Sequence, residues 1–278
     1  MRDDRASFTA RIVAAARALA TDGEGPLDPT ASAMLGAPWL ERARGPFARG
    51  LPRRALSALS LRVFDHVALR TRCIDDAVAD ASRTAKQLVI LGAGLDGRAW
   101  RLDALHDVVV FEVDHPATQA FKRRRASALT PRARDLRFVK VDFERDSLLE
   151  ELLGAGFDPE APAVWIWEGV TMYLEPATVR GSLGILGELS AAGSTLVVTY
   201  ATRESVLFRI GLERLIDTAF GILGEPLPGL TTPDDFRALV TRAGWTPVSD
   251  EGDEEMRQRY PGWQPAPWEE RVMVCRRG

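Results

Sequence analysis

A glycine-rich turn between two apolar runs constrains the fold of this 278-residue chain more than any other feature. Leu88–Leu91 and Val108–Phe111 lack polar–apolar alternation, so both are predicted to be strands buried on two faces. Between them stand Gly92-Ala93-Gly94 and a short predicted helix over 97–105. Glycine allows a sharp turn and a close approach of the backbone to a ligand. The order strand, glycine turn, helix and strand is typical of a nucleotide-binding βαβ unit.

Acidic residues stand at the ends of the strands that follow this turn. The second strand ends in Glu112-Val113-Asp114, about 20 residues after the glycines, where a carboxylate can accept hydrogen bonds from ribose hydroxyls. Asp142 and Glu168 follow the third and fourth predicted strands, over 136–141 and 163–167. Because ligands bind outside the carboxyl ends of the strands in an open parallel sheet, these acids are predicted to share one ligand-binding edge.

Motifs along the chain resemble those of the leucine carboxyl methyltransferase family: LGAGLDGRAWRL, FEVDHP, VDFE and WEGVTMYL, in this order. The resemblance covers about residues 65–200. Members of that family use S-adenosylmethionine as methyl donor. They include enzymes that methylate a protein C-terminal carboxylate and bacterial relatives such as the tetracenomycin-type polyketide carboxyl methyltransferases. The resemblance implies a Rossmann-like α/β fold of the class I methyltransferase type, with a seven-stranded, mostly parallel sheet whose last strand is antiparallel.

The same resemblance implies a role for Arg70, which lies in the stretch ALRTRCIDDAV. An arginine at this place in the family pairs with the carboxylate of the donor's methionine part, and a guanidinium suits that forked contact. Arg72 is the near alternative. Either arginine would otherwise be a surface partner of Asp75 or Asp76.

The resemblance also implies that Asp142 and the backbone of Phe143 lie beside the adenine ring of the donor. An alternative role for Asp142 is the N-cap of a helix predicted over 146–153. Taken together, the predicted donor-binding residues are Arg70, Gly92, Ala93, Gly94, Glu112, Asp114, Asp142, Phe143 and Glu168.

The predicted catalytic residues are Tyr173, Tyr200 and His115. Tyr173 follows the fourth strand and Tyr200 ends the fifth, predicted over 193–200, so both would line the methyl-transfer site, although Tyr173 could equally pack in the core. A carboxylate acceptor is ionised at neutral pH and needs no general base. A hydroxyl acceptor needs one, and His115, Tyr173 or Glu168 would be the candidates.

Two segments outside the βα units are predicted to complete the molecule. Residues 1–85 are expected to form a helical N-terminal cap on a core over 86–278. A helical pattern after the fifth strand, with its connector over about 204–229, interrupts that core and is predicted to be a lid over the acceptor. The last strands are predicted over 245–248 and 270–275, with a loop over 250–268 between them.

Composition narrows the class of protein. The net charge of −3 gives no basic excess for nucleic acid. No apolar run approaches the length that crosses a membrane. The three histidines form no metal-ligand cluster, and the two cysteines, far apart, fit a reducing cytoplasm. The expected partner is a small-molecule acceptor, and the expected assembly is a monomer or a homodimer.

The family resemblance implies an S-adenosylmethionine-dependent O-methyltransferase, which is expected to methylate a carboxylate of a small molecule, such as a polyketide or another secondary metabolite. Methylation of a protein C-terminal carboxylate is the nearest alternative. A nicotinamide-dependent oxidoreductase would also explain the glycine turn, but the chain has no Tyr-x-x-x-Lys pattern. A protein that binds the donor without catalysis is the third alternative.

Overall fold

The computed structural model describes residues 8–20, 28–36, 38, 40–41, 45, 62–142, 145–203, 227–264, 266 and 269–278. Several predictions therefore fall outside the described residues: the contact by Phe143, most of the lid over 204–229, and parts of the helical cap over 1–85. The predicted division into a cap over 1–85 and a core over 86–278 stays a prediction.

The described residues contain one seven-stranded sheet in the order β3-β2-β1-β4-β5-β7-β6. Strands β1 to β5 pair in parallel, whereas β7 lies antiparallel between β5 and β6. This arrangement confirms the predicted mostly parallel sheet with an antiparallel last strand. The strands are β1 (Gln87–Leu91), β2 (Val109–Asp114), β3 (Asp135–Lys140), β4 (Ala163–Trp167), β5 (Thr195–Ala201), β6 (Trp245–Glu251) and β7 (Glu270–Arg277).

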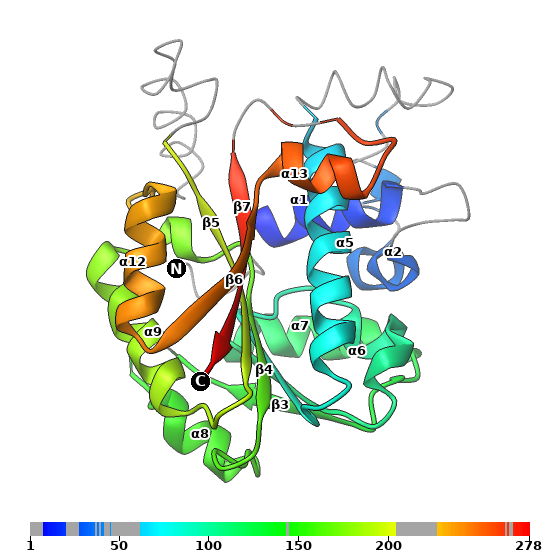
Figure 1. Cartoon of the computed structure of the whole chain (residues 1–278). Coiled ribbons are helices and arrows are strands. Elements are labelled where there is room, and N and C mark those ends of the chain that lie inside the picture. The colour runs from blue at the N-terminus through cyan, green and yellow to red at the C-terminus, as the bar shows by residue number, and fades with distance from the viewer. Residues whose placement is uncertain are drawn as a thin grey trace.

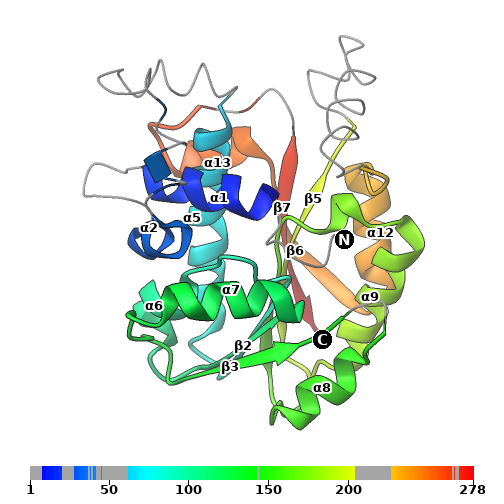
Figure 2. The ribbon, with the colours of Figure 1, turned by 180° about the vertical axis from the view of Figure 1, so that it is seen from behind.

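Helices cover both faces of this sheet (Figures 1 and 2). One face carries α1 (Phe8–Leu19), α2 (Pro29–Leu35), α5 (Val63–Ala81), α6 (Arg98–Arg101), α7 (Pro116–Ala126) and α13 (Asp253–Arg259). The other face carries α8 (Leu148–Gly154), α9 (Pro176–Glu188) and α12 (Pro233–Arg242). The described residues also contain two short 3-10 helices, η1 (Asp103–Leu105) and η2 (Thr171–Tyr173). None of the described helices combines the length and apolar composition needed to cross a membrane.

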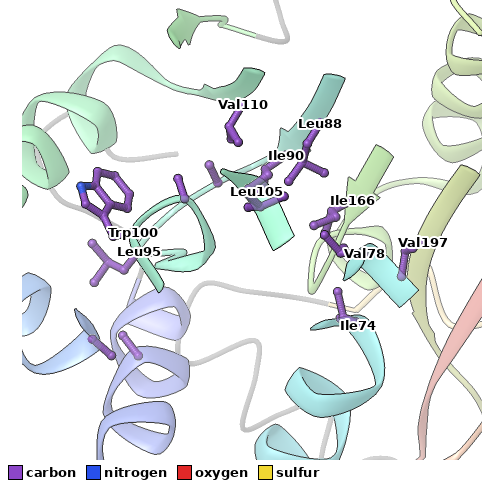
Figure 3. Close-up of a cluster of buried hydrophobic side chains, with 14 of the residues drawn as sticks. Ile74, Val78, Leu88, Ile90, Leu95, Trp100, Leu105, Val110, Ile166 and Val197 are labelled. Atoms are coloured by element: carbon purple, nitrogen blue, oxygen red, sulfur yellow. The ribbon is translucent and has the colours of Figure 1, made fainter. Parts of the chain in front are cut away.

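Strand β1 is buried along its whole length because both faces of the sheet are covered. Leu88 and Ile90 belong to the hydrophobic cluster under α5, and Val89 and Leu91 belong to the cluster under α8, α9 and α12. Figure 3 shows Ile166 of β4 and Val197 of β5 near Ile74 and Val78 of α5, in the same cluster as Ile90. The continuous apolar run therefore reflects a central strand with two buried faces.

Two elements differ from the sequence-based expectations. The predicted helix over 97–105 is divided into α6 and η1, because Leu102 has an extended backbone (φ −87°, ψ 114°). The expected loop over 250–268 contains α13, whose Glu255 carboxylate accepts a hydrogen bond from the Gly252 N–H at 2.9 Å. The acidic run thus caps a helix that begins at Asp253.

Candidate functional site

The glycine turn after β1 is fastened to the end of β2. Gly92 and Gly94 have left-handed backbones, with φ of 62° and 45°. The Gly94 N–H donates to Oδ2 of Asp114 at 2.5 Å, and the Ala93 N–H donates to the Val113 carbonyl at 3.1 Å. Burial raises the pKa of Asp114, although its hydrogen bonds from the backbone act in the opposite direction. The structure thus brings the three predicted turn residues and Asp114 together.

Replacing Gly92 by alanine is expected to destabilise the protein by about 1–2 kcal/mol. A Cβ there would lie 3.0 Å from Cγ2 of Val170, on a backbone that L-residues rarely adopt. Gly154→Ala, at the end of α8, is the matched control because its added Cβ meets no atom within 4 Å. Urea unfolding measures both variants. Equal effects of the two substitutions would contradict this account of the turn.

Glu168, directly after β4, lies among three arginines from three different helices. Its Oε1 is 2.6 Å from Nη2 of Arg17 and 3.0 Å from Nε of Arg70. Its Oε2 is 2.8 Å from Nη1 of Arg98. Burial alone would raise the pKa of Glu168, but the three guanidinium groups outweigh it and hold this pKa well below its usual range. The carboxylate is therefore held ionised.

Arg70 is the predicted arginine that the structure places at this carboxylate. It is buried, and Nη1 contacts Glu270 at the start of β7 while Nε contacts Glu168. Arg70 is therefore not a surface residue paired with Asp75, which was the alternative role. Asp75 pairs instead with Arg98 at 2.7 Å and with Arg101 at 2.6 Å.

Helices α1 and α2 pack over the turn. A Cβ at Gly94 would lie 3.5 Å from that of Ala10, and one at Gly97 would lie 2.1 Å from Oγ1 of Thr30. The same arrangement brings Arg17 to Glu168, a contact that was not predicted from the sequence. One signal was present: Arg17 interrupts an alanine-rich, otherwise apolar helix face, and a buried cation requires a partner.

Glu112 is placed differently from the other predicted donor-binding residues. It is fully buried, and its Oε2 lies 2.7 Å from Nζ of Lys122 on α7. Burial raises the pKa of Glu112 to about 7, although Lys122 acts in the opposite direction. Asp114, two residues later on the same strand, makes the contact with the turn. In this structure Glu112 belongs to a buried ion pair.

Asp142 follows β3 and is not the N-cap of the next helix, so that alternative is wrong. The cap of α8 is Ser147, whose hydroxyl accepts a hydrogen bond from the Glu150 N–H at 3.4 Å. The Asp142 N–H instead donates to Oδ2 of Asp146 at 2.8 Å. The predicted adenine contact of Asp142 stays a prediction.

Tyr200 lies on the sheet face opposite Glu168, contrary to its expected place in the methyl-transfer site. Its ring stacks on Phe236 at 4.1 Å, and its hydroxyl donates to Asp250 at 2.9 Å. Burial and the Asp250 carboxylate both raise the pKa of Tyr200. Side chains alternate along a strand, so the preceding residue, Thr199, faces the site, where its hydroxyl accepts a hydrogen bond from the Gly169 N–H at 2.8 Å.

His115 and Tyr173 both lie at the carboxyl edge of the sheet. His115 caps α7, and its Nδ1 accepts a hydrogen bond from the Ala117 N–H at 3.2 Å. The neutral ring therefore carries its proton on Nε2. Tyr173 ends η2 and is half-buried. Their catalytic roles stay predictions. In the part of the chain that the structure describes, no His, Cys, Asp and Glu side chains group into a metal site.

Two curated relatives of the chain share one description. A putative S-adenosyl-L-methionine-dependent methyltransferase of Mycolicibacterium paratuberculosis is 42% identical over 200 residues, which are 69% of this chain and 65% of that protein. Another, of Mycolicibacterium gilvum, is 34% identical over 92% of this chain and 81% of its own length. The chain thus spans slightly less than two thirds of the first of these relatives.

Solved structures share the fold of this chain. A DUF574 family protein from Streptomyces avermitilis superposes with a TM-score of 0.66 at 16% identity, covering 99% of both chains. A putative methyltransferase from Thermobifida fusca gives 0.58 at 17% identity, covering 98% of this chain and 95% of its own. The sequence pattern of the leucine carboxyl methyltransferase family matches residues 10–185. The chain therefore belongs to the leucine carboxyl methyltransferase family.

Proposed function

We propose that the protein is an S-adenosylmethionine-dependent methyltransferase that methylates a carboxylate of a small molecule, such as a polyketide or another secondary metabolite. The observation that carries the proposal is the buried pair of Arg70 and Glu168, 3.0 Å apart. This pair adjoins the glycine turn, because Cγ2 of Val170, two residues after Glu168, lies 3.0 Å from the position that a Cβ of Gly92 would take.

The residues of the site fit the chemistry of the donor. The amino-acid end of S-adenosylmethionine carries an ammonium and a carboxylate, and Glu168 and Arg70 offer the two complementary charges. Asp114 offers a carboxylate at the end of β2, where ribose hydroxyls are bound in this type of unit. Gly92 has no side chain, and even a methyl group at this position would come into close contact with Val170. When bound, the donor supplies a methyl group on a positively charged sulfur.

The protein's own groups favour a carboxylate as the acceptor. Glu168 is kept ionised by three arginines, so it is a weak base. Tyr200 is engaged with Asp250 on the other face of the sheet, and the Nδ1 of His115 is occupied by a backbone N–H. An acceptor that is already ionised needs none of these groups. The protein's contribution is then to position the reactants and exclude water, which supplies roughly 7–11 kcal/mol in well-oriented reactions.

The buried thiols of Cys73 and Cys275 are free. Because free thiols persist in a reducing compartment, we also propose that the protein is cytoplasmic.

Arg70→Ala is expected to weaken binding of S-adenosylhomocysteine by roughly 10- to 150-fold, the loss that follows from removing a hydrogen bond to a charged group. Calorimetric titration measures it. The matched control is Arg83→Ala, since Arg83 is an exposed arginine 3.7 Å from the exposed Asp80, and its affinity is expected to equal that of the wild type. Unchanged affinity in Arg70→Ala would remove Arg70 from the donor site.

The same titration with a nicotinamide dinucleotide separates the alternatives. Binding of the dinucleotide in place of S-adenosylhomocysteine would overturn the proposal in favour of an oxidoreductase. Once donor binding is established, transfer of label from the methyl donor to small carboxylic acids, with hydroxyl compounds and a peptide carboxyl terminus in parallel, tests the acceptor class. Labelling of the peptide alone would replace the small molecule by a protein carboxylate.

A further inference from the structure

The imidazole of His66, on α5, lies between two carboxylates from distant parts of the chain. Its Nδ1 is 2.7 Å from Oδ1 of Asp253 on α13, and its Nε2 is 2.9 Å from Oε2 of Glu270 on β7. The three side chains are only 3%, 4% and 7% exposed. An ionised carboxylate only accepts hydrogen bonds, whereas a neutral imidazole has a single N–H. Both contacts are therefore hydrogen bonds only when His66 is an imidazolium.

The two carboxylates connect His66 to different parts of the molecule. Oε2 of Glu270 is shared by His66 and by Nη1 of Arg70, and Nε of Arg70 contacts Glu168. The other oxygen of Asp253 accepts a hydrogen bond from the Ala266 N–H at 2.8 Å. A continuous chain of polar contacts thus runs from the segment after β6, through His66, to the arginine at the donor site.

We propose that protonated His66 is a positioning residue for donor binding: its charge balances Glu270, so that Arg70 stays available to an anionic ligand. The proposal rests on the proposed function for the identity of the ligand. Without the imidazolium, two buried carboxylates would face one another across His66, and Glu270 would pair with Arg70 alone. An arginine paired more fully with Glu270 attracts a ligand carboxylate less.

The charges around His66 make the expected effect depend on pH. Asp253 faces it from α13 and Glu270 from β7, while Asp65 and Arg70 are the neighbouring ionisable residues on its own helix. Burial opposes protonation, but the two facing carboxylates outweigh it and raise the pKa of His66 from 6.5 to about 9. In the folded protein His66 is therefore an imidazolium at neutral pH, and its contribution to donor binding is lost as the pH rises through about 9.

The test is calorimetric titration of S-adenosylhomocysteine from pH 7 to pH 10 with the wild type, His66→Gln and His106→Gln. His106 is the control because it is a histidine with 77% of its side chain exposed. At pH 7, His66→Gln is expected to bind roughly tenfold more weakly than the wild type. The ratio of the two dissociation constants should fall toward one by pH 10. Using the ratio cancels the titration of the ligand's own amino group.

A ratio that stays the same from pH 7 to pH 10 would show a packing role and overturn the proposal, as would equal affinities at pH 7. Asp253→Asn keeps the contact of His66 with Glu270 but removes one of the two charges, so it should shift the pH step of donor affinity below that of the wild type. This variant serves where His66→Gln does not fold, which thermal unfolding reports. If the wild type binds no S-adenosylhomocysteine, the proposed function fails and this inference with it; wild-type binding without a pH-dependent ratio overturns this inference alone.

Discussion

Replacing Glu168 by glutamine is expected to destabilise the folded protein by about 3–5 kcal/mol, the usual cost of removing one member of a buried ion pair. Nitrogen atoms of Arg17, Arg70 and Arg98 all lie within 3.0 Å of the Glu168 carboxylate. Arg70 keeps Glu270, and Arg98 keeps Asp75 and Asp96. Arg17 loses its carboxylate partner and keeps a hydrogen bond to the Thr71 hydroxyl at 3.2 Å.

Urea unfolding at neutral pH gives the free energy of unfolding of this variant. Glu188→Gln, an exposed change on α9, is the control and should fall within about 0.5 kcal/mol of the wild type. The folded-state pKa of Glu168 is depressed, so its contribution is present above the unfolded value of 4.5 and is lost as the pH falls through the folded value. The difference between wild type and Glu168→Gln should therefore shrink in acid. A difference that is small at neutral pH would contradict the ion-pair account.

The sheet was predictable because its pattern is local. The run around Val89 lacks alternation, and only a strand covered on both faces accommodates that pattern. The acids Asp114 and Glu168 were predicted at one edge because the carboxyl ends of parallel strands share an edge. The contact between Arg17 and Glu168 was not predictable in the same way. These residues are 151 positions apart, and no local spacing encodes which charges meet across a fold.

Some of the misplaced residues carried a signal that was not used. Period-2 alternation already separates Thr199 from Tyr200, so only one of them faces the turn, and the structure gives that place to Thr199. The acidic residues after Gly252 were read as loop, although acids in the first turn stabilise a helix. Alternation could not separate Glu112 from Asp114, since both point to the same face.

What separates these two acids is Lys122, which lies on the next helix and within the charge run KRRR. The structure buries Lys122 beside Glu112, 5.3 Å from the centre of the Trp100 ring, and leaves Arg123 and its neighbours exposed. A lysine on the buried side of an amphipathic helix pairs with the acid that lies opposite it on the adjacent strand. Which acid that is depends on how the helix packs on the sheet, and local sequence does not encode this packing.

Lys122→Met is expected to make the stability of the protein fall with rising pH above 7. Glu112 has a pKa of about 7 in the folded protein, raised by burial and opposed by Lys122. Removing the ammonium raises this pKa further, so the folded variant keeps a proton that the unfolded chain, with its ordinary pKa of 4.5, has already released. Each pH unit above 7 should then cost the variant up to about 1.4 kcal/mol relative to the wild type.

Urea unfolding of both proteins between pH 6 and pH 9 measures this divergence, which should reach roughly 2–3 kcal/mol at the upper end. The matched control is the double variant Lys122→Met with Glu112→Gln, which has no carboxyl group to protonate. Its stability should run parallel to that of the wild type above about pH 8, where Glu112 of the wild type is ionised in both states. Other groups that titrate in this range, His66 among them, are common to all three proteins and cancel in the differences. Parallel curves for Lys122→Met and the wild type would mean that solvent or another cation stabilises the ionised form of Glu112. The pairing with Lys122 would then contribute little.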